Sequence, residues 1–286
     1  MTTILQGTGN PIDIIARGAA RIVGERINPS GRSRLRQALL DHQWPYLAHE
    51  ARRQVEAGAD IIDVNVGGRG LDEVNLLPEA VRAVAEAVSV PLAIDTRLPA
   101  ALKAALAVCP GRPLVNSIGG EDKILAENLP IVAERGLPVV GLCMGQEGIP
   151  ATAQDRLKVA HRILEAAVRR GMKEEDVIFD PLVMTVGADD QAARIVLETI
   201  RLLRSEFPNS NITGGASNIS FGMPDRPAVS AGFLTVASVL GMNMPITDPT
   251  QVQLRSALLM ADVFLGYDRR SRRYMQFLRQ GSQTQV

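Results

Sequence analysis

Four short apolar segments of the chain each end at a carboxylate or a carboxamide. They are Ile94-Asp95-Thr96, Val115-Asn116-Ser117, Phe179-Asp180-Pro181 and Ser217-Asn218-Ile219. Stretches with the pattern of amphipathic helices lie between them, so the polar residues are predicted at the carboxyl ends of parallel strands, where an α/β barrel builds its active site. Two carboxylates and two amides supply both donors and acceptors, which suits a flat heterocycle.

The first predicted strand adds Glu25 and Asn28. In Val23-Gly24-Glu25-Arg26-Ile27-Asn28, the alternation of a strand places Glu25 with Ile27 on one face and Arg26 with Asn28 on the other. Glu25 is a candidate ligand-binding group, and an ion pair with a basic residue of the barrel is its structural alternative.

Asp63 and Asn65 share one face of the second predicted strand, which is predicted to point into the mouth of the barrel. Two polar groups there need a ligand or a hydrogen-bonded network, because an unpaired polar group is costly to bury. Asp95 has a local alternative, since an Asp at a strand end can cap the next helix. Capping is disfavoured for Asp180, which Pro181 follows directly.

Asn218 lies in a segment of small residues, 214–220, which allow a ligand to approach the backbone closely. A glycine-rich phosphate-binding loop at the seventh strand is the alternative for this segment. The residues that follow include Pro224 and Pro227 but no Lys, which weakens that alternative.

These side chains need a scaffold of alternating strands and helices. Eight strand-like runs are predicted, at residues 21–28, 60–67, 91–96, 114–119, 139–144, 177–183, 212–220 and 245–248. A helical stretch follows each run, as at residues 33–57, 151–170, 188–207 and 250–265. Eight such units predict a single α/β domain, closed as a (β/α)8 TIM barrel over residues 21–265. We expect residues 1–20 to pack over one end, and residues 266–286 to form a basic, solvated helix and a polar tail.

The bulk composition fits this architecture and excludes several classes of partner. A chain of 286 residues suits a barrel of roughly 250 residues, and 46% hydrophobic residues support a large core. A formal net charge of zero offers nothing to attract nucleic acid or an anionic membrane. No apolar run is long enough to span a membrane, the N-terminus lacks a secretion signal, and Cys109 and Cys143 are far apart. A cytoplasmic protein is therefore expected.

Several common catalytic arrangements are absent from the sequence. His42 and His49 are seven residues apart, too far for a metal pair on adjacent helical turns, and His161 is isolated. There is no Walker phosphate loop, no dinucleotide-binding glycine motif and no G-x-S-x-G elbow. No metal site is therefore predicted.

Six segments together resemble the pterin-binding methyltransferases. They are Val23-Gly24-Glu25-Arg26-Ile27-Asn28, Asp63-Val64-Asn65-Val66-Gly67, Ile94-Asp95-Thr96, Val115-Asn116-Ser117, Phe179-Asp180-Pro181-Leu182 and Ser217-Asn218-Ile219-Ser220. This group includes the methyltetrahydrofolate:corrinoid methyltransferases, the folate module of cobalamin-dependent methionine synthase, and the folate methyltransferases of demethylation systems such as that for glycine betaine. The resemblance runs from about residue 21 to residue 265.

The resemblance implies a barrel of the dihydropteroate-synthase type, commonly a homodimer, with the pterin across the mouth. It implies that Asp95, Asn116 and Asp180 hydrogen-bond the amino-pyrimidinone edge of the pterin. It also implies that Asn218 lies near N5, the nitrogen that carries the methyl group. Supporting positions in the mouth are implied for Glu25, Asn28, Asp63, Asn65 and Arg226.

The implied reaction moves a methyl group between N5 of tetrahydrofolate, as 5-methyltetrahydrofolate, and the cobalt of a corrinoid (cobalamin). Asn218 is the expected catalytic group, as a hydrogen-bond partner of N5. The direction of transfer is not decided by the sequence. Because the chain lacks the D-x-H-x-x-G corrinoid motif, we expect a separate corrinoid protein to dock over the barrel mouth.

Two positions depart from the family pattern. Gly145 stands where close relatives have an Asn after the fifth strand, and Gln146 is an alternative source of that contact. Arg97 replaces a smaller residue, and it either contacts the tail of the ligand or begins the next helix.

Two other functions are considered. Dihydropteroate synthase shares the barrel and the pterin site, but it should carry a Lys after the seventh strand and an Arg-x-His near the last. This chain has Ser217-Asn218-Ile219-Ser220 at the first place and no His after His161. A non-catalytic pterin-binding subunit is the second alternative, which the intact Asn218 and the carboxylates of the mouth disfavour.

Overall fold

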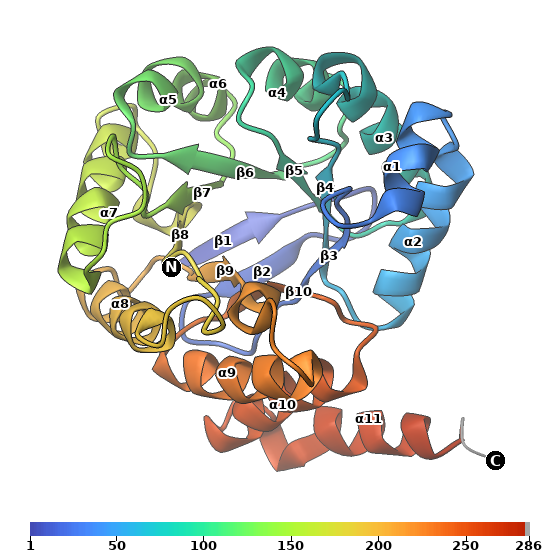
Figure 1. Cartoon of the computed structure of the whole chain (residues 1–286), viewed down its shortest axis with the longest axis vertical. Coiled ribbons are helices and arrows are strands. Elements are labelled where there is room, and N and C mark those ends of the chain that lie inside the picture. The colour runs from blue at the N-terminus through green and yellow to red at the C-terminus, as the bar shows by residue number, and fades with distance from the viewer. Residues whose placement is uncertain (284–286) are drawn as a thin grey trace.

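An eight-stranded parallel sheet curls into a barrel, and helices surround it (Figure 1). The strands are β3 (Val23–Ile27), β4 (Ile61–Asn65), β5 (Leu92–Asp95), β6 (Leu114–Gly119), β7 (Val139–Leu142), β8 (Val177–Asp180), β9 (Thr213–Gly215) and β10 (Met244–Thr247). They are hydrogen-bonded in the order β8-β7-β6-β5-β4-β3-β10-β9, and a parallel bridge from Phe179 to Ile212 joins β8 to β9. The predicted barrel of eight βα units is therefore confirmed.

This computed structural model describes residues 1–283 of the chain, with side chains for residues 1–279. The end of the predicted polar tail, residues 284–286, lies outside the described residues. No helix in the described part is long and apolar enough to cross a membrane.

Helices follow the strands along the chain. They are α1 (Ser33–Leu40), α2 (Trp44–Glu56), α3 (Glu73–Ala87), α4 (Pro99–Leu106), α5 (Asp122–Glu127), α6 (Leu129–Glu134), α7 (Ala153–Val168), α8 (Ala192–Glu206), α9 (Arg226–Leu240) and α10 (Val252–Phe264). A last helix, α11 (Arg272–Gln283), lies outside this ring beside α10 (Figure 1). The prediction of one helix over residues 33–57 is wrong: His42 has a φ of 51° and Pro45 stands in the first turn of α2, so the chain turns between α1 and α2.

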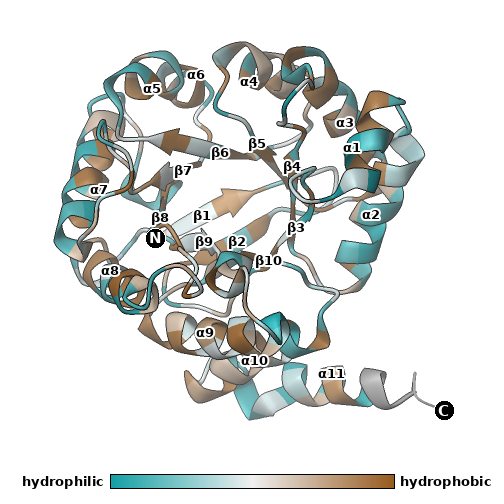
Figure 2. Ribbon diagram, viewed as in Figure 1, coloured by the Kyte–Doolittle hydropathy of each residue, from teal (hydrophilic) through white to brown (hydrophobic). Residues whose placement is uncertain are grey.

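Residues along each strand pack alternately on the two sides of the barrel wall. Ile62, Val64 and Ile94 are fully buried in the layer between the strands and the helices. Figure 2 shows this layer as hydrophobic residues on the strands, with hydrophilic residues on the outer turns of the helices. The alternation sends Asp63 and Asp95 to the inside of the barrel.

A hairpin covers the amino end of the barrel. It consists of the antiparallel strands β1 (Thr2–Leu5) and β2 (Ile12–Ile15). Leu5 and Ile14 are at most 1% exposed, and they pack against the first inward-pointing residues of the barrel strands, such as Ile61 and Ile178. The carboxyl ends of the strands form the open end of the barrel.

Candidate active site

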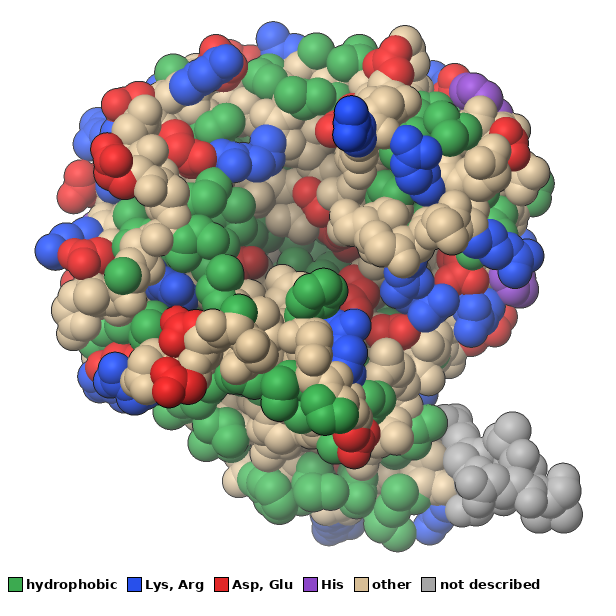
Figure 3. Space-filling model, in the orientation of Figure 1, with side chains coloured by type: hydrophobic (Ala, Val, Ile, Leu, Met, Phe, Trp, Pro, Cys, Tyr) green, Lys and Arg blue, Asp and Glu red, His purple; other side chains and the backbone are tan. Residues whose placement is uncertain are grey.

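A cavity of about 970 Å³ opens at the carboxyl ends of the barrel strands. Figure 3 shows acidic side chains around this hollow. The predicted site residues in its lining are Glu25, Asn28, Asp63, Asp95, Asn116, Asp180, Asn218 and Arg226. Asn65 is the predicted site residue outside the lining, and its side chain bonds to Asp95. The volume falls at the upper end of the range for small-molecule sites, roughly 300–1,000 Å³.

Two carboxylate–amide pairs form the wall of the cavity at β4, β5 and β6. Asn116 Nδ2 donates to Asp63 Oδ1 at 2.9 Å, and Asn65 Nδ2 donates to Asp95 Oδ2 at 2.7 Å. The parallel ladder places Asn65 beside Asp95, and Asp95 beside Asn116. The second oxygen of each carboxylate makes no hydrogen bond within the described residues, so both are available to a ligand with N–H donors.

The environment of these carboxyls favours their neutral forms. Burial raises the pKa of Asp95 to about 6, against the hydrogen bond from Asn65. Burial raises the pKa of Asp63 further above its ordinary value, and the charge of Asp95 adds to that rise. Simultaneous ionisation of the two carboxyls is therefore disfavoured, and the wall can present one carboxylate and one carboxylic acid to a ligand.

Asp180 ends β8 on another wall of the cavity and is 8% exposed. Its Oδ1 accepts a hydrogen bond from the backbone N–H of Leu182 at 2.7 Å, within a local turn. The guanidinium of Arg156 holds the same turn by donating to the carbonyls of Pro181 and Leu182 at 2.7 and 2.8 Å. Burial raises the pKa of Asp180 to about 6, although the Leu182 amide and the charge of Arg156 oppose the rise.

Neither strand-end Asp caps the following helix. At β5 it is the hydroxyl of Thr96, not Asp95, that accepts from the backbone N–H of Leu98 at 3.2 Å. The capping alternative for Asp95 is therefore wrong. Both Asp95 and Asp180 remain directed into the cavity.

The raised pKa of Asp180 predicts that the ligand-free protein loses stability as the pH rises. The folded-state pKa of about 6 lies above the ordinary 3.8. The contribution of neutral Asp180 to the free energy of unfolding is therefore fully present below pH 3.8 and is lost as the pH rises through 6. Asp180→Asn removes the buried charge, so its free energy of unfolding at pH 8 should exceed that of the natural chain by about 2–3 kcal/mol. The difference should vanish toward pH 4. Urea unfolding between pH 4 and 8 measures this difference. The control is Asp190→Asn, an exposed carboxylate on the loop after β8.

The predicted alternation of the first strand is wrong. The ladder between β3 and β4 shifts register between Gly24 and Ile27, so Ile27 packs outside the barrel wall while Glu25 lines the cavity. Ser217 Oγ donates to Glu25 Oε1 at 2.7 Å. The alternative ion pair for Glu25 is also wrong within the described residues, where no basic side chain bonds to it. Burial, with the nearby charge of Asp248, raises the pKa of Glu25.

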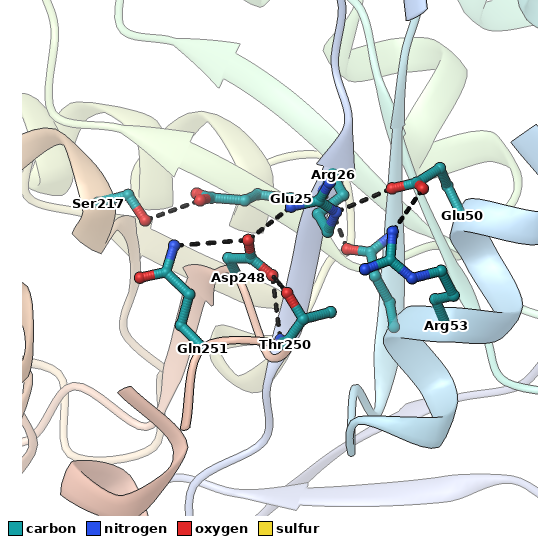
Figure 4. A network of polar contacts seen from close by, with 9 residues as sticks. Glu25, Arg26, Glu50, Arg53, Ser217, Asp248, Thr250 and Gln251 are labelled. Carbon is teal, nitrogen blue, oxygen red and sulfur yellow. Dashed lines mark hydrogen bonds and ion pairs between the residues drawn. The ribbon is translucent and has the colours of Figure 1, made fainter. Parts of the chain in front are cut away.

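Arg26 pairs with two acids of a neighbouring network instead (Figure 4). Its Nε donates to Glu50 Oε2 and its Nη1 to Asp248 Oδ2, both at 2.8 Å. Arg53 also pairs with Glu50, and the hydroxyl of Thr250 donates to Asp248 Oδ1 at 2.7 Å. Asp248 lines the cavity and was missed by the sequence analysis, although it follows the apolar strand β10 as Asp95 and Asp180 end theirs.

Asn218 does not lie at the end of a strand. The predicted strand over residues 212–220 is too long: β9 ends at Gly215, and a 3₁₀ turn, η2 (Ala216–Ser220), carries Asn218. The exposed Asn218 side chain makes no hydrogen bond with the described residues. A Cβ on Gly215 would lie 2.8 Å from Asn218 Nδ2, so a larger residue there would displace the Asn218 side chain. Arg226 Nη2 donates to the Ser217 carbonyl at 2.9 Å and holds the turn.

The remaining predicted positions lie around the rim. Asn28 Oδ1 accepts from the backbone N–H of Ser30 at 2.9 Å. Arg97 lines the cavity and forms an ion pair with Glu121, and it does not begin α4, whose first residue is Pro99. Gln146 is outside the lining, and its Oε1 accepts from the backbone N–H of Asp122 at 3.2 Å.

The donors and acceptors of the cavity suit a neutral heterocycle better than a metal ion. No group of three or more His, Cys, Asp or Glu side chains within the described residues is arranged to hold a metal. The walls instead offer carboxylate oxygens on β4, β5 and β8, with carboxamides on β6 and on the turn after β9. Such a set can hold a ring edge of N–H donors at one side and a reacting nitrogen at the other.

Comparisons with known proteins agree with this arrangement. A family model described as pterin binding enzyme matches residues 24–248. A methylcorrinoid:tetrahydrofolate methyltransferase from Eubacterium limosum is 31% identical over 262 residues, which cover 91% of this chain and 96% of that protein. Methionine synthase from Mycobacterium tuberculosis is 28% identical over 243 residues, but only 20% of its length is matched.

Solved structures with the same fold include dihydropteroate synthases. One from Yersinia pestis in complex with a pterine–sulfa conjugate has a TM-score of 0.68 at 19% identity, covering 92% of this chain and 98% of that one. One from Xanthomonas albilineans has a TM-score of 0.68 at 18% identity, with the same coverage. At such low identity the likeness concerns the fold alone.

Proposed function

The chain belongs to the pterin binding enzyme family, and from that premise we propose that it transfers a methyl group between a corrinoid and N5 of tetrahydrofolate. The corrinoid is a co-substrate carried by a separate protein. The E. limosum relative is named for transfer from a methylcorrinoid to tetrahydrofolate, and it matches this chain over almost its whole length. We assign the same net direction to this chain.

The pterin would lie across the cavity with its amino-pyrimidinone edge toward Asp95, Asn116 and Asp180. Carboxylate oxygens accept hydrogen bonds from the 2-amino group and the ring N–H, and a carboxamide can pair with either a donor or an acceptor. Asp63 and Asn65 support this edge through their bonds to Asn116 and Asp95. Glu25, Asn28 and Arg226 would surround the other end of the ring.

The free carboxamide of Asn218 is the observation that carries the proposed reaction. It projects into the cavity from η2 without a partner among the described residues. During transfer to N5, its oxygen can accept a hydrogen bond from N5–H and orient the nitrogen lone pair toward the methyl group. In the opposite direction its N–H₂ group can donate to N5 as the methyl group departs. A neutral amide therefore serves both directions.

Dihydropteroate synthesis is less well supported. The solved synthases share the fold at less than 20% identity. At the end of β9, where such an enzyme should carry a Lys, this chain has the η2 turn with Asn218. The chain has no His after His161 that could complete an Arg-x-His near the last strand.

Anaerobic mixing of the protein with tetrahydrofolate and free methylcobalamin tests the proposed function. Loss of the methylcobalamin absorption bands, with formation of 5-methyltetrahydrofolate, is the expected result. A protein that binds tetrahydrofolate but transfers no methyl group, even from a methylated corrinoid protein, would be a binding subunit. Formation of dihydropteroate instead would identify the synthase.

The corrinoid protein would dock on an apolar rim around the mouth. We use this term for four exposed side chains on the loops after β5, β7, β8 and β9: Leu98, Ile149, Met184 and Phe221. They are between 42% and 66% exposed. Because these loops follow the carboxyl ends of the strands, the rim surrounds the position where the methyl donor must enter. Exposed apolar groups around a reactive opening suit a protein partner.

An aspartate introduced on this rim should weaken the binding of the corrinoid protein. Met184→Asp and Ile149→Asp are each expected to raise KM for a methylated corrinoid protein by about tenfold, because each would desolvate a charge in the complex. Neither side chain lines the folate cavity, so the rate with free methylcobalamin should not change. The control is Val168→Asp, which is 53% exposed at the far end of α7. An unchanged KM in both rim variants would contradict docking on this surface.

The cellular setting and the oligomeric state form the last part of the proposal. Cys109 and Cys143 are free thiols, which suits the reducing cytoplasm. A homodimer would cover exposed apolar side chains on adjacent helices, namely Val236 and Val239 on α9 and Phe264 on α10.

A further inference from the structure

Methyl transfer to N5 releases a proton that needs an acceptor. As the N5 lone pair attacks the methyl group, the N–C bond forms and the Co–C bond breaks with its electron pair on cobalt. The hydrogen of N5 then leaves as a proton. In the opposite direction a proton must reach N5 as the methyl group departs. An acid–base group close to N5 would serve both directions.

The cavity is lined by five carboxyl groups. Four of them are bonded to another side chain or are assigned to the pyrimidinone edge of the pterin. Asp95 and Asp180 face the end of the cavity assigned to the pyrimidinone edge, and Asp63 is bonded to Asn116. Asp248 is held by the guanidinium of Arg26 at 2.8 Å, which lowers its pKa together with the Thr250 hydrogen bonds. An ion-paired carboxylate is a poor proton acceptor.

Glu25 is the remaining carboxyl, and it contacts the turn that carries Asn218. Ser217 Oγ donates to its Oε1 at 2.7 Å, and Ser217 directly precedes Asn218 in η2. The second oxygen of Glu25 makes no hydrogen bond with the described residues, and the side chain lines the cavity. Arg226 binds the Ser217 carbonyl rather than Glu25, at 2.9 Å. One oxygen of Glu25 is thus fixed beside Asn218 and the other is available.

We propose that Glu25 is the proton acceptor for N5 during methyl transfer to tetrahydrofolate, and the proton donor in the opposite direction. This assignment rests on the proposed methyltransferase function. The charged and polar groups that face Glu25 are Asp248, Asp63, Arg32, Arg226 and Ser217.

The environment tunes Glu25 for this role. Burial and the charge of Asp248 raise its pKa, while the Ser217 hydrogen bond and the charges of Arg32 and Arg226 oppose the rise. The net pKa of Glu25 lies above the ordinary 4.5. A carboxyl with a raised pKa holds a proton more readily than an ordinary one, which favours general acid–base catalysis.

The pH dependence of single-turnover methyl transfer tests this assignment. Transfer from methylcobalamin to tetrahydrofolate needs ionised Glu25, so the rate of the natural chain should rise with pH through the Glu25 pKa. Glu25→Gln keeps the shape but cannot take a proton, so the rate should fall by about 10²-fold and this rise should disappear. Glu25→Asp should retain the rise of the rate with pH, although the rate itself should be lower. Ser217→Ala removes a hydrogen bond that lowers the pKa, so the rise should move to higher pH.

Proton linkage supplies a readout that is independent of turnover. Titration calorimetry of tetrahydrofolate binding, in buffers of different ionisation enthalpy, counts the protons exchanged by the protein. Glu25→Gln should change that count while the Kd stays within about threefold, because Glu25 acts on the transferring proton more than on the bound ring. The matched control is Glu127→Gln, an exposed carboxylate on α5.

The outcomes separate this inference from the function on which it rests. A Glu25→Gln protein with the natural rate, pH profile and proton count would overturn the role of Glu25 and leave the methyltransferase intact. A natural chain that transfers no methyl group from any corrinoid donor would overturn both.

Discussion

Alanine at Asp95 or at Asp180 is expected to weaken tetrahydrofolate binding by about 2–4 kcal/mol, because either change leaves N–H donors of the buried pterin without an acceptor. In Kd this is roughly 30- to 700-fold. Both carboxylates line the cavity on strands that are not neighbours, so the two effects arise from separate contacts with the ring. Fluorescence or calorimetric titration of tetrahydrofolate measures them.

Two controls make this result interpretable. Asp190→Ala removes an exposed carboxylate from the loop after β8 and should leave Kd unchanged. Thermal melting of each variant checks the fold, because Asp95 also accepts the side-chain amide of Asn65. If both folded variants bound tetrahydrofolate as tightly as the natural chain, the pterin would not bind at Asp95 and Asp180.

Asn218→Ala is expected to slow methyl transfer by about 10²–10³-fold while tetrahydrofolate binding stays close to that of the natural chain. In the proposed complex the amide of Asn218 contacts N5, whose bonding changes during the reaction, so its loss should lower kcat more than it raises KM. Rapid mixing with methylcobalamin gives the rate, and an equilibrium titration of tetrahydrofolate gives the affinity.

A matched variant separates this effect from damage to the turn. Asn218→Asp keeps the carbonyl oxygen but has no N–H₂ group, so it should lose more activity from 5-methyltetrahydrofolate to cob(I)alamin than in the opposite direction. The η2 turn itself is held by Ser217 and Arg226, which both variants retain. Asn218→Ala with natural turnover would exclude Asn218 from the reaction.

The strand-borne half of the site could be predicted from the sequence, because two regularities of parallel barrels bear on it directly. Alternate residues of a strand point to the same side, and all carboxyl ends meet at one mouth. Asp63, Asn65, Asp95, Asn116 and Asp180 follow both rules, and their side chains are brought together as predicted.

The rest of the site depends on departures from regular geometry. A register shift in β3 separates Glu25 from Ile27, and the change from strand to 3₁₀ turn after Gly215 sets the position of Asn218. Neither has a periodic signal in the sequence. Arg26 forms an ion pair with Asp248, which lies 222 residues away in the sequence, and only the closed barrel brings the two together. Arg32 and Arg97 lie on loops, where side-chain direction has no period to predict it.

The hairpin β1–β2 has a consequence for the order of events in catalysis. With the amino end of the barrel covered by Leu5 and Ile14, folate must enter and leave through the mouth on which the corrinoid protein would dock. A partner docked there would trap the folate already inside and exclude the folate still outside. Docking at the mouth would thus impose a compulsory sequence, in which folate binds first and departs last.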